Sequence, residues 1–193
     1  MNKIILLLFL VVSISSLSQE TNYIDNDTVL SWDMTRKLKW VDFKGVKDTT
    51  NYSRHGAVTN YSLYLFPKKI YPKDYEKINV IPLMYKNTSW SVDESVGLLL
   101  HEQLHFDIAE LYARKIRKCF EELKKGGENN IYTYIKIANE LDFQCTEYQK
   151  LYDSETRHGQ IGLRQLAWQR KIARELNELM NYSYKAKLKD IQN

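Results

Sequence analysis

Hydrophobic and polar positions divide the chain into an N-terminal part with strand-like runs and a C-terminal part with helical periodicity. Thr28–Trp32 and Ala57–Phe66 are rich in β-branched and aromatic residues and are predicted to be strands. Ile78–Tyr85 is another apolar run, and Pro82 inside it predicts a strand at the edge of a sheet. Such an edge could pair with an extended peptide, or it could simply be a protected edge.

From about residue 92 the apolar positions recur at helical spacing, and three helices are expected. The first runs from a capping box at Ser91–Glu94 to about Lys124 and stops at Gly126-Gly127. The second and third are predicted over about 131–152 and 161–180. The fold class is therefore α+β, with a small, mostly antiparallel sheet from the N-terminal half packed on a long helix and two further helices.

The first 18 residues have the composition of a secretory signal peptide. Met-Asn-Lys precedes the apolar run Ile4–Val12, which is too short to span a bilayer, and Ser13–Ser18 is rich in small residues. We expect the mature protein to be exported, to the periplasm or the cell exterior, as one domain over residues 19–193 without a membrane span. Removing Lys3 from 28 basic residues leaves 27 against 24 acidic ones, a net charge of +3. No basic block indicates nucleic acid as a partner.

His101-Glu102-Gln103-Leu104-His105 matches the H-E-x-x-H pattern. On a helix, residues i and i+4 lie one above the other, so both imidazoles can reach one metal ion. Glu102 lies about 100° round the helix, where its carboxylate can take a proton from a metal-activated water. Zinc is the expected ion, because with three protein ligands it keeps a position open for water. The alternative is a buried amphipathic helix whose histidines have other partners.

A third ligand must come from a later segment, because Ile108 and Leu111 replace the Gly and His of the extended pattern H-E-x-x-H-x-x-G-x-x-H. If the first two helices form an antiparallel hairpin, His105 lies opposite about residue 150, since each helix rises 1.5 Å per residue. Candidate ligands at that level are Asp153, Glu155 and His158.

The same register separates the two cysteines. Cys119 would face about residue 136, which leaves Cys145 on the order of 13 Å away along the axis, beyond the ~7 Å limit for a disulfide. An exported chain nevertheless favours pairing of two cysteines, and a shifted helix crossing would permit it. A disulfide and two buried thiols therefore both stay open.

Further motifs surround the metal helix and carry a family resemblance. They are Leu38-x-Trp40-x-Asp42-Phe43-x-Gly45, Ser89-Trp90, Leu100–Asp107, Ala113-Arg114, Tyr152–Gly159, Gln165 and Trp168. In these motifs the chain resembles the bacterial family of secreted zinc-dependent proteases that was first catalogued as a domain of unknown function. That family is grouped with the zincin-like H-E-x-x-H metallopeptidases. The resemblance covers most of the mature chain, from about Leu38 to Trp168.

The resemblance implies that Tyr152–Gly159 completes the metal site, in agreement with the hairpin register. Within it we favour His158, because imidazole is a common zinc ligand and Gly159 lets the chain turn there; Asp153 and then Glu155 are the alternatives. Each could instead be an ordinary residue of a helix end. Asp107 could hold the second nitrogen of a ligand imidazole or be solvated. Tyr152 and Arg157 are candidates for stabilising an oxyanion, with packing and surface roles as the alternatives.

The expected function is hydrolysis of peptide bonds in a peptide or protein substrate, with Zn²⁺ as cofactor and Glu102 as general base. Two alternatives remain. One is a non-catalytic exported binding module with a structural zinc, and the other is a zinc hydrolase of non-peptide amides or esters, which shares the same chemistry.

Overall fold

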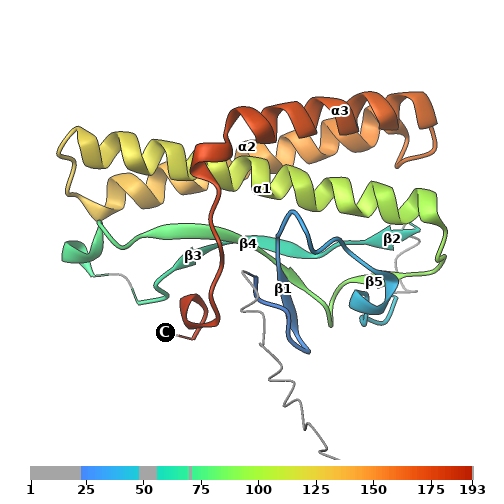
Figure 1. The fold of residues 1–193 in the computed structure, drawn as a ribbon, viewed down its shortest axis with the longest axis horizontal. Helices are drawn as coiled ribbons and strands as arrows, with labels where there is room; N and C mark the ends of the chain where they lie inside the picture. The colour runs from blue at the N-terminus through green and yellow to red at the C-terminus, as the bar shows by residue number, and fades with distance from the viewer. Residues whose placement is uncertain (1–22, 48–55, 70, 193) are drawn as a thin grey trace, which may run out of the picture.

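A computed structural model of the chain describes residues 23–47, 56–69 and 71–192. Its helices are α1 (Val96–Lys125), α2 (Ile131–Thr156) and α3 (Gly162–Glu178). Figure 1 shows them as one layer above a small antiparallel sheet. Five strands are described: β1 (Val29–Ser31), β2 (Ala57–Val58), β3 (Tyr61–Phe66), β4 (Asn79–Tyr85) and β5 (Trp90–Ser91). The prediction of an α+β fold with a small antiparallel sheet and three helices is confirmed.

β4 is the central strand, so the prediction that Ile78–Tyr85 forms a sheet edge is wrong. The strand order is β1-β4-β3, and Pro82 pairs with Leu63 of β3. Pro82 O accepts a hydrogen bond from Trp32 N at 3.3 Å. The backbone N and O of one strand residue point to the same side. The side on which Pro82 lacks an N–H is therefore the side of β1, at a point just past Ser31, the last residue of β1. The ladder with β3 therefore loses no hydrogen bond.

The continuous apolar sequence of β4 reflects burial on both faces. Val80 and Met84 pack under the helices, whereas Ile81 and Leu83 lie in a cluster on the opposite face with Ala186 of the C-terminal segment. That segment passes the sheet beyond α3 and ends on the side away from the helices (Figure 1). A strand that is covered on both faces is apolar at successive positions, so its sequence shows no alternation of polar and apolar residues.

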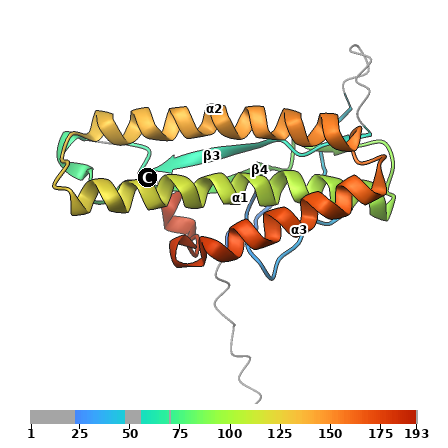
Figure 2. The ribbon, with the colours of Figure 1, turned by 90° about the horizontal axis from the view of Figure 1, so that it is seen from above.

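Helix α1 lies between α2 and α3 and also rests on the sheet, as Figure 2 shows from above. Its N-cap is Ser95, whose Oγ accepts from Leu98 N at 3.4 Å, and not the predicted capping box, because Ser91 belongs to β5. It ends at Lys125, before the predicted Gly126-Gly127 turn. α2 then returns antiparallel and continues to Thr156, four residues past the predicted end. Cys119 and Cys145 are both free thiols.

A buried ion cluster ties α1 to its neighbours. Glu110, Arg114 and Arg117 are 2%, 1% and 6% exposed, and one Glu110 oxygen accepts from both guanidinium groups at 2.7 Å. Arg114 also donates to Leu176 O of α3, and Arg117 to Val80 O of β4. The one carboxylate therefore compensates two buried cations that each hold another element to α1.

No helix among the described residues is long and apolar enough to cross a membrane. The segment predicted to be a signal peptide, residues 1–18, lies outside the part of the chain that the structure describes.

Replacing Glu110 with Gln is expected to lower the free energy of unfolding by about 3–5 kcal/mol, because two buried guanidinium groups would lose their counter-charge. Urea denaturation followed by circular dichroism measures the loss. The matched control is Glu122→Gln on the same helix, which breaks an exposed 3.9 Å pair with Lys118 and should cost no more than about 1 kcal/mol. Equal losses for the two variants would contradict the role given to the cluster.

Candidate metal centre

His101 and His105 extend from one face of α1 toward the same point. Their Nε2 atoms are 3.1 Å apart, and the side chains are 4% and 15% exposed. The ring of Tyr152, which is fully buried, stacks on His101 with centroids 4.8 Å apart and meets His105 edge-on. Helical spacing thus aims the two imidazoles together, and packing against one aromatic ring fixes their orientation.

Asp153 of α2 completes a triangle with the two histidines. Its Oδ1 lies 3.1 Å from His101 Nε2 and 3.0 Å from His105 Nε2, so the three atoms are nearly equidistant. An ion with bonds of ~2.05 Å in tetrahedral geometry would hold its ligands about 3.3 Å apart. Two imidazole nitrogens and one carboxylate oxygen at this spacing therefore fit a zinc ion with one position left for another group.

Each histidine is supported from behind by a glutamine. Gln149 Oε1 of α2 contacts His105 Nδ1, and Gln149 Nε2 donates to His105 O at 2.9 Å. Gln165 Oε1 of α3 lies 3.4 Å from His101 Nδ1 and accepts from Tyr152 OH at 2.6 Å. An amide oxygen at Nδ1 favours the tautomer with its proton there, which leaves both Nε2 lone pairs for a metal.

The turn after α2 brings His158 next to Asp153 and His101. Arg157, His158 and Gly159 all have positive φ (49°, 54° and 79°), and His158 N donates to Asp153 O at 2.9 Å. His158 Nδ1 then lies 3.5 Å from Asp153 Oδ1. A Cβ on Gly159 would come within 3.0 Å of the His101 ring. Only glycine fits this position, both for its φ and for its distance from His101.

Glu102 is held beside the triangle by Thr59, the residue that follows β2. Thr59 donates to Glu102 Oε2 from its backbone N–H at 2.8 Å and from its hydroxyl at 2.7 Å. Glu102 is 3% exposed and Thr59 is 8% exposed. With Oε2 occupied twice, the carboxylate is fixed in orientation, and Oε1 is the oxygen left to act on another group.

These residues line a cleft of about 290 Å³ between α1, α2 and the segment Ala57–Tyr61. His101, Glu102, His105 and Asp153 form one wall of it, and Lys150 is its one lysine or arginine among the described residues. The donor atoms therefore face a cavity that a ligand can enter.

Electrostatics keep Asp153 anionic. Burial alone would raise its pKa, but hydrogen bonds with His101 and His105 outweigh burial and hold the pKa well below its ordinary value. Burial alone would lower the pKa of His105, and its hydrogen bond with Asp153 together with the charge of Glu102 raises it instead. The histidines thus meet a concentrated negative charge, which a bound cation would also experience.

The remaining predicted residues, Glu155, Tyr152, Arg157 and Asp107, are not corners of the triangle. Glu155 accepts from Trp168 Nε1 at 2.8 Å, at the contact between α2 and α3. Tyr152 lies behind the histidines, and burial raises its pKa, while Arg157 is exposed in the turn. Asp107 contacts Trp32, Gln103 and Lys37, and the imidazole Nδ1 positions are taken by glutamines.

Two residues of the site, Thr59 and Gln149, were not predicted. Gln149 has a usable signal, because it lies four residues before Asp153 and so shares its helix face. Thr59 has none, since it is 43 residues from Glu102 in sequence.

Comparisons of this chain with protein families, with curated proteins and with solved structures found no match. The family resemblance carried by its motifs therefore stays a prediction.

We expect Asp153→Asn to weaken zinc binding more than about 100-fold, beyond the loss typical of residues that only support a ligand. His158→Ala should cost less, because His158 Nδ1 lies 3.5 Å from Asp153 Oδ1, whereas the two Nε2 atoms lie within 3.1 Å of it. Competition with a fluorescent chelator measures each affinity, and Glu155→Gln on the same helix end is the control, expected to bind as wild type. A larger loss for His158→Ala than for Asp153→Asn would make His158 the third ligand.

Proposed function

We propose that this protein is a zinc-dependent hydrolase that cleaves peptide bonds, with the metal held by His101, His105 and Asp153. The observation that carries the proposal is the fixed carboxylate of Glu102 next to three equidistant metal donors in an open cleft. The packing of the H-E-x-x-H helix against a small antiparallel sheet supports the resemblance to zincin-like proteases.

The donor set suits zinc. Two neutral imidazoles and one carboxylate are a known catalytic ligand set for this ion, and each imidazole is oriented by an amide oxygen. When bound, zinc would polarise a substrate carbonyl and make a water molecule more acidic.

Glu102 would act as general base and then as general acid. Its Oε1 accepts a proton from the attacking water as the new C–O bond forms, and it returns the proton to the amide nitrogen as the C–N bond breaks. Thr59 keeps Oε2 out of this exchange through its two hydrogen bonds. The carboxylate therefore needs no reorientation between the two transfers.

The substrate would lie extended along Ala57–Thr59. β2 pairs only with β5 among the described residues, and Gly56 O and Asn60 O accept from Val92 N and Tyr85 N on that side. Because backbone groups alternate along a strand, Ala57 and Thr59 direct theirs to the opposite edge, which borders the cleft, and there Thr59 N already donates to Glu102. The rest of this strand edge, at Ala57, lies beside the reactive centre, which favours a polypeptide substrate held by backbone hydrogen bonds.

One observation favours the alternative of a binding module with a structural zinc. The donor atoms of His101, Asp153 and His158 lie within 4.8 Å of one another, so a small movement of the turn would add a fourth protein ligand. A site closed by four protein ligands has no position for water and would not hydrolyse substrate.

Glu102→Gln is expected to keep one zinc per chain and to reduce hydrolysis at least roughly 100-fold, because the amide cannot accept the proton. Zinc content is measured by mass spectrometry, and turnover with a library of quenched fluorescent peptides. Glu121→Gln, an exposed change on the same helix, should leave both values at those of wild type. Turnover that survives Glu102→Gln would exclude this mechanism.

Thr59→Val should lower kcat about tenfold or more without changing zinc content, because one of the two donors to Glu102 is lost. KM should change little, since the backbone at the cleft edge is unaltered. Thr59→Ser retains the hydroxyl and is expected to restore kcat. A valine variant as fast as wild type would show that the hydroxyl does not position Glu102.

A further inference from the structure

A second cavity, here called the α1–α3 cavity, lies between α1, α3 and the segment 32–38 that follows β1. Its volume is about 680 Å³, within the range of small-molecule sites. It shares no lining residue with the metal cleft. The reason is helical geometry: Gln103 and Asp107 lie on the opposite side of α1 from His101 and His105. The two cavities are therefore separate binding spaces on one helix.

The walls of this cavity are mostly apolar and partly open to solvent. They are formed mainly by Trp32, Leu38, Leu99, Leu104, Leu176 and Met180. At the rim, the side chains of Met34 and Leu100 are 52% and 48% exposed. Large apolar side chains left open around a formed cavity are typical of sites that bind an apolar group.

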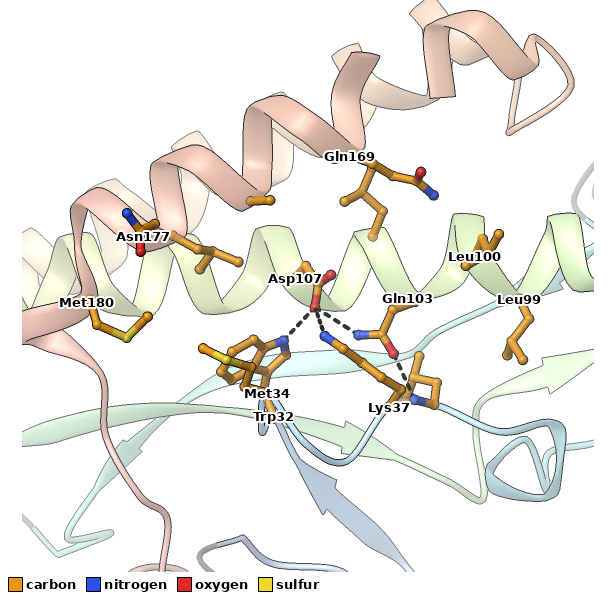
Figure 3. A pocket seen from close by; sticks show the side chains of 14 residues that line it. Trp32, Met34, Lys37, Leu99, Leu100, Gln103, Asp107, Gln169, Asn177 and Met180 are labelled. Atoms are coloured by element: carbon orange, nitrogen blue, oxygen red, sulfur yellow. Dashed lines mark hydrogen bonds and ion pairs between the residues drawn. The ribbon is translucent and has the colours of Figure 1, made fainter. Parts of the chain in front are cut away.

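Three polar groups that line the cavity converge on one oxygen of Asp107. Its Oδ1 accepts from Trp32 Nε1 at 2.7 Å and from Gln103 Nε2 at 2.8 Å, and Lys37 Nζ lies 3.6 Å away. Gln103 Oε1 in turn accepts from Leu38 N at 2.7 Å. Figure 3 shows the three contacts meeting at this oxygen. The network fixes the position of the Asp107 carboxylate from three sides.

The second oxygen of Asp107 has no such partner. No described residue donates a hydrogen bond to Oδ2, and Figure 3 shows it turned away from the three donors, into the space between α1 and α3. The side chain is only 17% exposed. A sheltered carboxylate oxygen with free lone pairs is a strong acceptor for a charged donor.

The negative charge of Asp107 favours a positively charged donor at Oδ2. Trp32 and Gln103 are neutral, and Lys37 is 51% exposed, so its attraction to Asp107 is weakened by water. The half-exposed lysine can move toward solvent, whereas the Asp107 carboxylate is held in place by Trp32 and Gln103.

We propose that the α1–α3 cavity binds small apolar molecules that carry a primary ammonium group, with the ammonium on Asp107 Oδ2 and the apolar body along α3. Aliphatic amines and peptides with an apolar first residue share this chemistry.

Calorimetric titration of the full chain with three probes of equal chain length tests the proposal: n-octylammonium, n-octanol and octanoate at neutral pH. The expected result is one octylammonium per chain, bound at least tenfold more tightly than the other two. Equal affinity for octanol would mean an apolar site without a role for Asp107. Tighter binding of octanoate would make Lys37 the anchor. Either result, or no binding of any probe, overturns the proposal.

Variants locate the binding. Asp107→Asn retains the accepting Oδ1 and replaces Oδ2 with an N–H donor, so it should remove the preference for octylammonium. Lys37→Gln removes the nearby like charge and should strengthen octylammonium binding. Ala173→Phe fills the cavity from α3 without touching the network and should weaken all binding at least fivefold. Preference retained in Asp107→Asn, or full affinity in Ala173→Phe, would place the ligand elsewhere and overturn the proposal.

Two further ligands distinguish the sources. Leucyl-leucine amide has a free terminal ammonium and two apolar side chains, and its N-acetylated form lacks the charge. If the free form binds more tightly than octylammonium and acetylation abolishes binding, the occupant is a peptide N-terminus. If octylammonium binds and the peptide does not, it is a free aliphatic amine.

Discussion

The burial of α1 on three sides is the constraint on which the rest of the structure depends. A helix between two other helices and a sheet can keep ionisable side chains only if neighbouring elements satisfy them. Each neighbour does so here: the strand segment through Thr59, α2 through Gln149 and Asp153, and α3 through Gln165 and Leu176 O. The contacts that organise the metal centre are therefore also contacts that hold the elements together.

Different parts of α1 carry different contacts with the neighbouring elements. The part near its N-terminus carries the face with His101 and His105 and, on the opposite side, the α1–α3 cavity, whereas the following turns carry the Glu110 ion cluster. The cluster anchors the helix to β4 and to α3 by hydrogen bonds to backbone oxygens. The N-terminal part of α1 can thus border cavities on two sides without losing its position, because the helix is fixed further along.

The features predictable from the sequence are those set by local spacing. His101 and His105 share a face because of the helical repeat, and the Gly126-Gly127 break with a constant rise per residue brings α2 back so that His105 meets Asp153. Features set by distant pairing were missed. Thr59 has no periodic signal, and the effect of Pro82 depends on where its neighbour β1 ends. The predicted start of α1 was too early, because Ser91 pairs with Ala57 in a strand. Local capping preferences carry no information about that pairing.

Gly159 shows how a position without any functional group can be bound to the chemistry of a site. It touches the His101 ring so closely that a methyl group would displace a candidate metal ligand, and its backbone conformation ends the turn that carries His158. Selection for catalysis or metal binding would therefore act on this glycine as strictly as on the histidines. Descendants of this chain that lost Gly159 could no longer hold His101 in its present position, even where H-E-x-x-H remains in their sequences.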